Sequence, residues 1–383
     1  MRRRHLVFVV TVPVTARVLL RGQLAYLREH GFEVTLISSP GPELDVVAER
    51  EGVRVIGIPI EREIDPPADA IALARLTRTL RALRPDLVNA STAKGGLLGM
   101  LAARAARVSR RVYVLRGLRL ETEAGVKRAV LGVTERIASS CAHRVICVSE
   151  SLRARYVADG FAPAAKCAVL GAGSSNGVDV ARFARTPARE AEAAKLRTQL
   201  AIAPDAFVIG FVGRPVADKG IVELLDAFDE LRTRRAATLV VIGAGFADDT
   251  LDPAIARRVV GRSDIVDVGR VDEPAPYYAM MDVLAFPSHR EGFPNAPLEA
   301  AAAAIPTVGA RATGVIDAVV DGETGLLCEI GDARGLAARI ETYAQDPGLR
   351  FTHGARAAER AAAEYARERV WERWRAEYER LLR

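Results

Sequence analysis

Short apolar segments alternate with longer segments of helical periodicity along the first half of the chain. The apolar segments are rich in Val, Ile and Leu, and they predict strands at Leu6–Val10, Glu33–Ile37, Val53–Ile58, Leu87–Ala90, Val112–Leu115, Val145–Val148 and Cys167–Leu170. Helical spacing between them is clearest at Ala16–His30, Ala70–Leu83 and Lys94–Val108. Continuous apolar strands separated by helices are typical of a parallel sheet covered on both faces.

The second half of the chain repeats this alternation. It predicts strands at Phe207–Val212, Thr238–Ile242, Ile265–Val268, Val283–Phe286 and Thr307–Val308, and helices at Gly220–Arg232, Pro253–Val260, Ala296–Ala303, Ala333–Gln345 and Arg350–Arg367. Phe183–Lys195 lacks an apolar stripe, so we expect the domain boundary there. The fold class is therefore α/β, with two Rossmann-like parallel-sheet domains, residues 1–185 and 186–365, facing across a cleft. Residues 366–383 predict a final helix that packs back on the first domain.

Charge is distributed unevenly between the two predicted domains. Residues 1–190 contain 30 Lys or Arg and 18 Asp or Glu, a net charge of +12, whereas residues 191–383 carry −6. A basic half indicates phosphate, nucleic acid or a membrane surface as partner, or simply a solvated arginine-rich surface. It lacks the interleaved aromatic residues of nucleic-acid stacking surfaces, so we expect no nucleic acid.

Composition narrows the class of protein further. Half of the 383 residues are hydrophobic and 27% are charged, which excludes wholesale disorder. No run of about 18 apolar residues occurs, so we expect no transmembrane helix. Pro13 and Arg17 interrupt the apolar start, which we interpret as a buried strand rather than a signal peptide. The four cysteines form no zinc-type cluster, which favours reduced thiols in the cytoplasm.

A strand-to-helix connection in the second half carries two carboxylates. Ser288–Glu299 follows the strand Val283–Phe286, with Glu291 in the loop and Glu299 on the next helix. Carboxylates at such a position can accept hydrogen bonds from the vicinal hydroxyls of a sugar. Taken alone, the same pattern is typical of surface carboxylates that cap a helix.

A second connection carries two cations. Arg214 and Lys219 flank the turn Gly213–Gly220, which leaves a strand and enters a helix. Backbone N–H groups at a helix N-terminus favour anions, and two neighbouring cations add to that preference. The turn therefore predicts a diphosphate site, with a plain tight turn and a solvated lysine as the alternative.

Four motifs occur in a fixed order along the chain: Asn176–Phe183, Gly213–Gly220, Ser288–Glu299 and Asp321–Leu327. Together they resemble the retaining GT-B glycosyltransferases of family four, over nearly the whole chain. The resemblance implies a hexosyl- or N-acetylhexosaminyl-type transferase that uses a nucleotide-sugar donor, with a UDP-sugar expected in preference to a GDP-sugar. It implies no cofactor and no metal ion.

The resemblance also implies roles for the matching residues. Arg214 and Lys219 would hold the donor diphosphate and stabilise the leaving group, and Glu291 would contact hydroxyls of the transferred sugar. These three form the expected catalytic set. Glu299 would accept hydrogen bonds from the ribose hydroxyls. The remaining expected donor-binding residues are Gly213, Gly292, Phe293, Pro294 and Asn295.

A narrower resemblance lies in the first half. Ala90–Gly99 and Gly173–Gly177 resemble the capsular-polysaccharide branch, whose members extend lipid-linked oligosaccharides at the cytoplasmic face of the membrane. It implies a polyprenyl-diphosphate-linked acceptor, an anionic membrane surface, and a cytoplasmic location on the inner face of the cell membrane. Arg116 replaces a His that many relatives carry, and an arginine binds phosphate but cannot act as a base. The expected acceptor-binding residues are Ser91, Thr92, Lys94, Gly95, Arg116 and Arg119.

A basic cluster predicts the membrane-docking surface of the first domain. It comprises Arg104, Arg107, Arg110, Arg111, Arg116, Arg119, Lys127 and Arg128. Apolar residues at helical spacing lie beside these cations in the sequence, and we expect most of them in the core; they are Leu97, Leu98, Met100, Leu101, Val126, Val130, Leu131 and Val133. A few exposed members would suffice for docking beside a polybasic patch.

Two alternative functions stay open. One is another GT-B enzyme, such as a nucleotide-sugar epimerase or a disaccharide synthase. The other is a non-catalytic subunit of a polysaccharide assembly complex, although the intact Arg214, Lys219, Glu291 and Glu299 argue against it.

Overall fold

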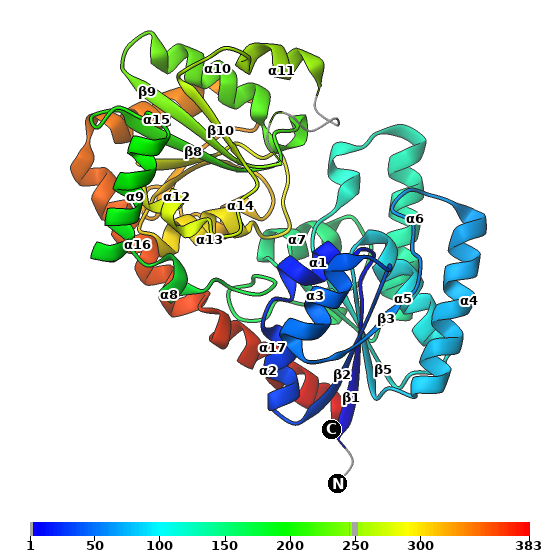
Figure 1. Cartoon of the computed structure of the whole chain (residues 1–383). Coiled ribbons are helices and arrows are strands. Elements are labelled where there is room, and N and C mark those ends of the chain that lie inside the picture. The colour runs from blue at the N-terminus through cyan, green and yellow to red at the C-terminus, as the bar shows by residue number, and fades with distance from the viewer. Residues whose placement is uncertain (1–2, 245, 247–251) are drawn as a thin grey trace. The chain divides into compact units, whose positions relative to one another are not determined.

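The computed structural model describes residues 3–244, 246 and 252–383, and the chain divides into two compact units (Figure 1). Unit 1 comprises Met1–Asn176 and Glu368–Arg383, and unit 2 comprises Gly177–Arg367. The division therefore falls at Asn176, earlier in the chain than residue 185, and the last helix groups with the first sheet.

Unit 1 is built on a parallel sheet of seven strands in the order β3-β2-β1-β4-β5-β6-β7. The strands are β1 (Arg4–Val9), β2 (Phe32–Ser38), β3 (Arg54–Gly57), β4 (Leu87–Ser91), β5 (Arg110–Leu115), β6 (Arg144–Cys147) and β7 (Cys167–Ala168). The helices are α1 (Pro13–Leu19), α2 (Gln23–Glu29), α3 (Pro42–Glu51), α4 (Pro66–Leu83), α5 (Ala93–Ala105), α6 (Gly125–Cys141), α7 (Glu150–Ala158) and α17 (Arg367–Leu382). Short 3₁₀ helices lie at η1 (Arg119–Thr122) and η2 (Ala164–Lys166). Every strand predicted in this half is present.

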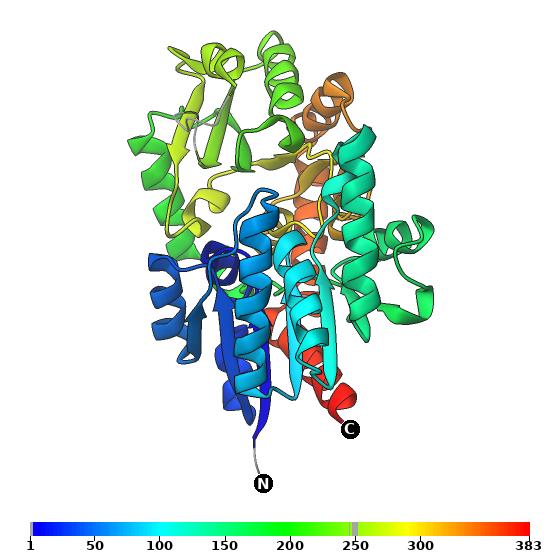
Figure 2. The ribbon, with the colours of Figure 1, turned by 90° about the vertical axis from the view of Figure 1, so that its right-hand side faces the viewer.

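The central strands of unit 1 are buried on both faces. Leu6 of β1 lies opposite Val34 of β2 and Leu87 of β4, and all three side chains are buried. Helices α4, α5 and α6 lie side by side over the sheet (Figure 2). Such burial explains why most residues of these strands are apolar.

Helix α17 packs on unit 1 through aromatic side chains. The Asn89 side-chain amide donates to Tyr378 Oη at 2.5 Å, and Trp371 Nε1 donates to Asn176 Oδ1 at 2.6 Å. The Trp371 ring also explains why the predicted helix Ala16–His30 is in fact two helices. Gly22 adopts φ +79° between α1 and α2, and a Cβ there would lie 2.6 Å from that ring.

Unit 2 is built on a parallel sheet of six strands in the order β10-β9-β8-β11-β12-β13. The strands are β8 (Phe207–Gly213), β9 (Ala237–Gly243), β10 (Ile265–Gly269), β11 (Val283–Phe286), β12 (Thr307–Ala310) and β13 (Gly325–Cys328). The helices are α8 (Val180–Phe183), α9 (Pro187–Gln199), α10 (Ile221–Arg232), α11 (Pro253–Val259), α12 (Ala275–Ala279), α13 (Asn295–Ala302), α14 (Val315–Ala318), α15 (Ala333–Gln345) and α16 (Pro347–Glu364), with a 3₁₀ helix at η3 (Ala217–Lys219). The short strand β13 was not among the predicted strands.

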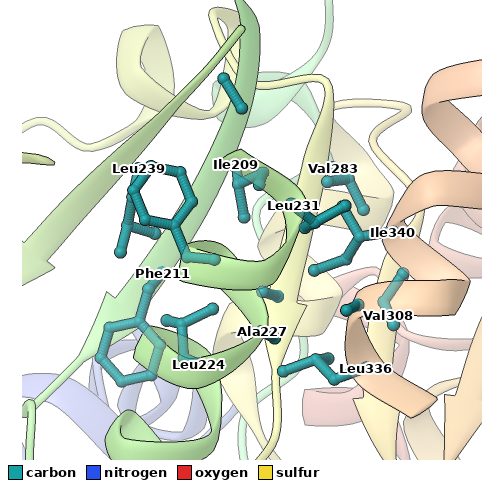
Figure 3. Close-up of a cluster of buried hydrophobic side chains, with 14 of the residues drawn as sticks. Ile209, Phe211, Leu224, Ala227, Leu231, Leu239, Val283, Val308, Leu336 and Ile340 are labelled. Carbon is teal, nitrogen blue, oxygen red and sulfur yellow. The ribbon is translucent and has the colours of Figure 1, made fainter. Parts of the chain in front are cut away.

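The core of unit 2 holds α10 and α15 on the sheet (Figure 3). Leu224 and Leu231 of α10 pack with Ile209 of β8, and Leu336 and Ile340 of α15 join the same buried cluster. Each fully buried side chain of this kind stabilises the fold by roughly 1.5–3 kcal/mol. The cluster therefore sets where α10 begins, directly after the predicted diphosphate turn.

The second part of Phe183–Lys195, where the domain boundary was expected, belongs to helix α9. Thr186 begins the helix as its cap, with Oγ1 accepting from the Arg189 backbone N–H at 3.2 Å. Arg197 Nη2 then donates to Met280 O at 2.7 Å and fixes the other end. The helix is held by capping and hydrogen bonds with little apolar burial, so its sequence shows no stripe.

Both sheets reverse their strand order at one point. In unit 1 the reversal lies between β1 and β4, and in unit 2 it lies between β8 and β11. Open parallel sheets bind ligands beyond the carboxyl ends of their strands at such reversals. In each unit, the loops that follow the two strands at the reversal are therefore where the predicted site residues of that unit can act together.

Candidate active site

The turn after β8 carries the two predicted cations of unit 2. The Arg214 side chain is exposed, and no described residue pairs with its guanidinium. Gly220 adopts φ +72° where α10 begins, and a Cβ there would lie 2.2 Å from Pro287 O. Only glycine allows this turn to approach the end of β11 so closely.

Lys219 forms an ion pair with Glu291 of the loop after β11. Lys219 Nζ lies 2.5 Å from Glu291 Oε1, and Ser288 Oγ donates to the same oxygen at 3.0 Å. Two residues of the expected catalytic set, 72 positions apart in sequence, are thus brought together at the strand-order reversal. The lysine charge is matched by a carboxylate, whereas Arg214 stays available to an anion.

A third loop supports this pair from the end of β12. The Glu291 backbone N–H donates to Thr313 O at 3.0 Å. Gly314 adopts φ +77°, and a Cβ there would lie 2.4 Å from Gly292 O. This glycine was not among the predicted site residues, although its position four residues after the buried strand β12 was the available signal.

Glu299 lies on α13 and is held by a buried tyrosine. Tyr278 Oη donates to Glu299 Oε2 at 2.7 Å. Burial raises the pKa of the Glu299 carboxyl, and the tyrosine hydrogen bond partly opposes that rise. Sequence reasoning did not find Tyr278, because nothing links it to Glu299 along the chain.

The other expected donor-binding residues lie at the end of β8 and in the segment that leads into α13. Gly213 ends β8, Pro294 is the cap residue of α13, and Asn295 opens that helix. The Phe293 ring is buried against Tyr365, with ring centroids 5.2 Å apart.

In unit 1, two threonines meet at the strand-order reversal. Thr11 Oγ1 lies 2.6 Å from Thr92 Oγ1 and accepts from the Gly95 backbone N–H at 2.9 Å. A Cβ at Gly95 would lie 2.8 Å from the Thr11 backbone nitrogen, so the start of α5 requires a glycine there. Thr11, which the sequence left without a role, therefore joins the loops after β1 and β4.

A cavity of about 320 Å³ opens beside these threonines. Three of the six expected acceptor-binding residues line it, namely Thr92, Lys94 and Arg119. Its apolar lining includes Ile64, Leu97, Val130 and Leu131, and its polar lining includes Thr11, Arg62, Asp69 and Thr134. The cavity thus combines apolar wall with cations, which suits an amphipathic anion.

Lys94 is not a free cation in this cavity. Its Nζ lies 2.8 Å from Asp69 Oδ1 and also contacts Glu63 O. The expected residues Ser91 and Gly95 do not line the cavity, since Ser91 is buried in β4 and Gly95 contacts Thr11.

Arg116 lies outside the cavity, in a different environment. Its Nε and Nη1 atoms are buried and hydrogen-bond no described residue. Burial lowers the pKa of the guanidinium to about 10, with Tyr378 opposing the shift. A buried cation with unused donors is a receptor for an anion.

The predicted basic cluster is wrong as a single patch. Arg110 and Arg111 begin β5 whereas Arg119 follows its end, so one strand of six residues, roughly 20 Å, separates them. Arg110 Nε donates to Leu381 O at 2.5 Å, and Arg111 Nε donates to Cys141 O at 2.6 Å. These arginines cap the carboxyl ends of helices.

Among the described residues, no group of three or more His, Cys, Asp or Glu is arranged to hold a metal ion. No described helix combines the length and apolar character needed to cross a bilayer.

Two family models match the chain, one in each unit. The glycosyl transferase 4-like domain matches residues 15–173, and glycosyl transferases group 1 matches residues 206–346. The chain belongs to this family of glycosyltransferases and has the GT-B fold. The predicted resemblance is thereby confirmed.

Particular relatives resemble the chain over different lengths. The capsular polysaccharide biosynthesis glycosyltransferase CapM of Staphylococcus aureus is 35% identical over 385 residues, covering 100% of this chain and 99% of that protein. The D-inositol 3-phosphate glycosyltransferase of Kineococcus radiotolerans is 38% identical over 204 residues, covering 48% of this chain and 46% of that protein. Among solved structures, Anabaena HepE in complex with UDP-glucose has a TM-score of 0.81 at 22% identity, covering 98% of this chain and 99% of that one.

Proposed function

We propose that this glycosyltransferase moves a hexose or N-acetylhexosamine from a UDP-sugar to a hydroxyl of a lipid-linked saccharide, with retention of anomeric configuration. The product would be an intermediate of cell-surface polysaccharide synthesis, made at the inner face of the cell membrane by a peripheral protein. Full-length similarity to CapM supports the polysaccharide role, and the UDP-glucose complex of HepE supports the UDP-sugar.

The observation that carries the proposal is the Lys219–Glu291 ion pair at the strand-order reversal of unit 2, on the same turn as the exposed Arg214. Departure of a nucleoside diphosphate places negative charge on phosphate oxygens, and fixed cations stabilise that charge. Lys219 would exchange Glu291 for the diphosphate, and the released carboxylate would accept hydrogen bonds from the transferred sugar. Glu299 would accept from the ribose hydroxyls.

The reaction needs no strongly basic protein carboxylate. The acceptor hydroxyl attacks the anomeric carbon from the face that the diphosphate leaves, and the bond from that carbon to the phosphate oxygen breaks. The departing phosphate oxygen takes the proton of the hydroxyl, so the protein's contribution is binding, orientation and electrostatic stabilisation.

Unit 1 would bind the acceptor. The cavity beside Thr92, Lys94 and Arg119 combines cationic and apolar lining, as a polyprenyl diphosphate requires. Arg116, with its unpaired Nε and Nη1, would take a second anionic group of the substrates.

A donor screen tests the activity. Purified protein is incubated with UDP- and GDP-sugars, with and without a bacterial membrane lipid extract, and the released nucleoside diphosphate is measured. We expect release from a UDP-sugar that rises when the extract is added, and a product whose anomeric configuration matches the donor by NMR. Release that never depends on an acceptor would point to an epimerase, and no release from any donor would point to a non-catalytic subunit.

Substitution of the two cations tests the site. Arg214→Ala and Lys219→Ala should each lower transfer by about 10- to 100-fold, because charge-assisted hydrogen bonds contribute roughly 1.5–3 kcal/mol. Arg234→Ala is the matched control, since Arg234 pairs with Glu230 on the surface of α10 and the adjoining turn. Near-parent turnover in the Arg214→Ala/Lys219→Ala double variant would remove the diphosphate assignment.

A further inference from the structure

Helix α6 presents apolar side chains to the outside of unit 1. Val126, Val130, Val133 and Ile137 are 80%, 42%, 52% and 38% exposed, and we name these four residues the α6 stripe. Their spacing of four, three and four residues places them along one line of the helix. Isolated exposed apolar residues are ordinary, but a continuous line of them marks an interaction surface.

The opposite side of α6 carries a carboxyl group into the core. Glu135 is 8% exposed and accepts hydrogen bonds from Tyr113 Oη at 3.0 Å and Tyr156 Oη at 3.1 Å. It is the only acidic residue between Gly125 and Cys141. The outward surface of α6 therefore combines valines and cations without a carboxylate of its own.

Three cations of α6 lie near the stripe, with Lys127 and Arg136 on its two sides and Arg128 farther round the helix. Lys127 pairs with Glu123 at 2.6 Å, and Arg128 lies 4.0 Å from Asp159. Arg136 has no carboxylate partner among the described residues, and its guanidinium lies 5.4 Å from the centroid of the Phe161 ring.

Each flank of the stripe adjoins a cavity. Arg128, Arg136 and Phe161 line one of about 350 Å³ together with Asp159, so the cavity holds two guanidinium groups and one carboxylate. On the other flank, Val130 belongs both to the stripe and to the lining of the 320 Å³ cavity that holds Thr92 and Lys94.

We propose that the α6 stripe inserts into an anionic lipid bilayer, with its flanking cations on lipid phosphates, and that it leads the lipid chain of the acceptor into the 320 Å³ cavity. Apolar residues flanked by Lys and Arg are the composition of helices that lie in the membrane interface. The three cations of α6 outnumber the two carboxylates beside them, Glu123 and Asp159, and Arg136 has no carboxylate partner among the described residues, so an anionic lipid headgroup complements it. The second step, delivery of the acceptor, rests on the proposed function.

Vesicle co-sedimentation of the full chain tests the insertion. The vesicles contain phosphatidylcholine alone or phosphatidylcholine with phosphatidylglycerol, each at 0.1 M and 1 M salt, where screening lengths are about 10 Å and 3 Å. We expect the protein to bind the anionic vesicles at low salt. Binding to the neutral vesicles, and binding to the anionic vesicles at high salt, should each be at least about tenfold weaker.

Two substitutions at the stripe carry the structural claim. Val126→Glu/Val133→Glu should lower binding to anionic vesicles by about tenfold or more, since both residues face outward and neither lines the acceptor cavity. Val260→Glu is the matched control, because Val260 is also 80% exposed but lies in unit 2. Circular dichroism and UDP affinity, expected to be unchanged, show that the double variant is folded.

The outcomes separate this inference from the proposed function. Loss of vesicle binding in the double variant but not in Val260→Glu supports the inference, even if the chain transfers no sugar. Equal vesicle binding by parent and double variant overturns it, even if transfer to a soluble saccharide acceptor proceeds. Self-association of the parent without lipid, abolished by Val126→Glu/Val133→Glu in sedimentation velocity, would assign the stripe to a second copy and also overturn it.

Discussion

Replacing Glu135 by Gln removes a buried ionisable group whose effect on the free energy of unfolding depends on pH. Burial raises the pKa of the Glu135 carboxyl from 4.5 to about 7, and the hydrogen bonds from Tyr113 and Tyr156 offset part of that rise. Above pH 7 the folded protein therefore holds a carboxylate beneath α6, where its hydration is lost.

The direction of the pH effect follows from the two pKa values. Between pH 4.5 and about 7 the folded chain keeps the proton and the unfolded chain has lost it. This group's contribution to stability is complete below pH 4.5, falls as pH rises through the interval, and is lost above about pH 7. At about 1.36 kcal/mol per pKa unit, the interval corresponds to about 3 kcal/mol.

Urea unfolding of parent and Glu135→Gln at pH 5 and pH 8 measures this quantity. The two tryptophans, Trp371 and Trp374, both lie in α17 of unit 1, so their fluorescence reports the unit that contains Glu135. Glutamine keeps an acceptor for the tyrosines and carries no charge. We expect the free energy of unfolding of Glu135→Gln to exceed that of the parent by about 3 kcal/mol at pH 8 and by less than about 1 kcal/mol at pH 5.

A substitution beside the carboxyl provides the control. Tyr113→Phe removes a hydrogen bond that favours the charged carboxylate, so it should enlarge the loss of stability between pH 5 and pH 8. An equal difference between Glu135→Gln and the parent at both pH values would refute the reasoning, because titration of this carboxyl could not then be its source.

Three further predictions concern the active site. Glu299→Ala should mainly weaken UDP binding and Glu291→Ala should mainly lower kcat, because only contacts to the reacting sugar change in the transition state; calorimetry and turnover decide this, and undiminished UDP affinity of Glu299→Ala contradicts the ribose role. Gly220→Ala should lower both Tm and donor affinity. Gly261→Ala is the control, because Gly261 also has positive φ but has open space around it, and it should lower neither donor affinity nor turnover. Equal effects in the two variants would show that the close approach of Gly220 to the end of β11 does not matter for donor binding. Arg116→Gln should raise KM for the lipid acceptor at least about tenfold and Arg116→Lys should recover part of the loss, with an unchanged KM in Arg116→Gln counting against an anion there.

The parallel α/β architecture was predictable because it depends on a local signal. Strands buried on both faces are largely apolar, and the runs Leu6–Val9 of β1, Phe207–Val212 of β8 and Val283–Phe286 of β11 mark such strands in the sequence. The polar helix α9 and the break at Gly22 were not predictable, because capping and the approach of Trp371 determine them.

The donor residues were predictable individually and not as partners. Arg214, Lys219 and Glu291 follow buried strands in the sequence, and this place marks them as candidates at one edge of the sheet. That Lys219 bonds Glu291, or that Tyr278 holds Glu299, depends on which loops the strand order brings together. Strand order is a property of the tertiary fold, and the linear sequence contains no local signal for these pairs.

Helix α6 gives the clearest example of what the sequence determines and what only the tertiary structure determines. The sequence by itself places Val126, Val130 and Val133 at helical spacing, with cations near them and Glu135 as the single carboxyl between Gly125 and Cys141. Because apolar residues on helices are ordinarily buried, most of the apolar residues near these cations were expected in the core. Leu98 and Met100 of α5 do lie there. In the tertiary structure, α6 instead directs Glu135 into the core, because Tyr113 and Tyr156 supply the hydrogen bonds that permit this carboxyl to be buried. Which side of a helix faces inward depends on the partners that the fold provides, and this decided that the valines of α6 face outward.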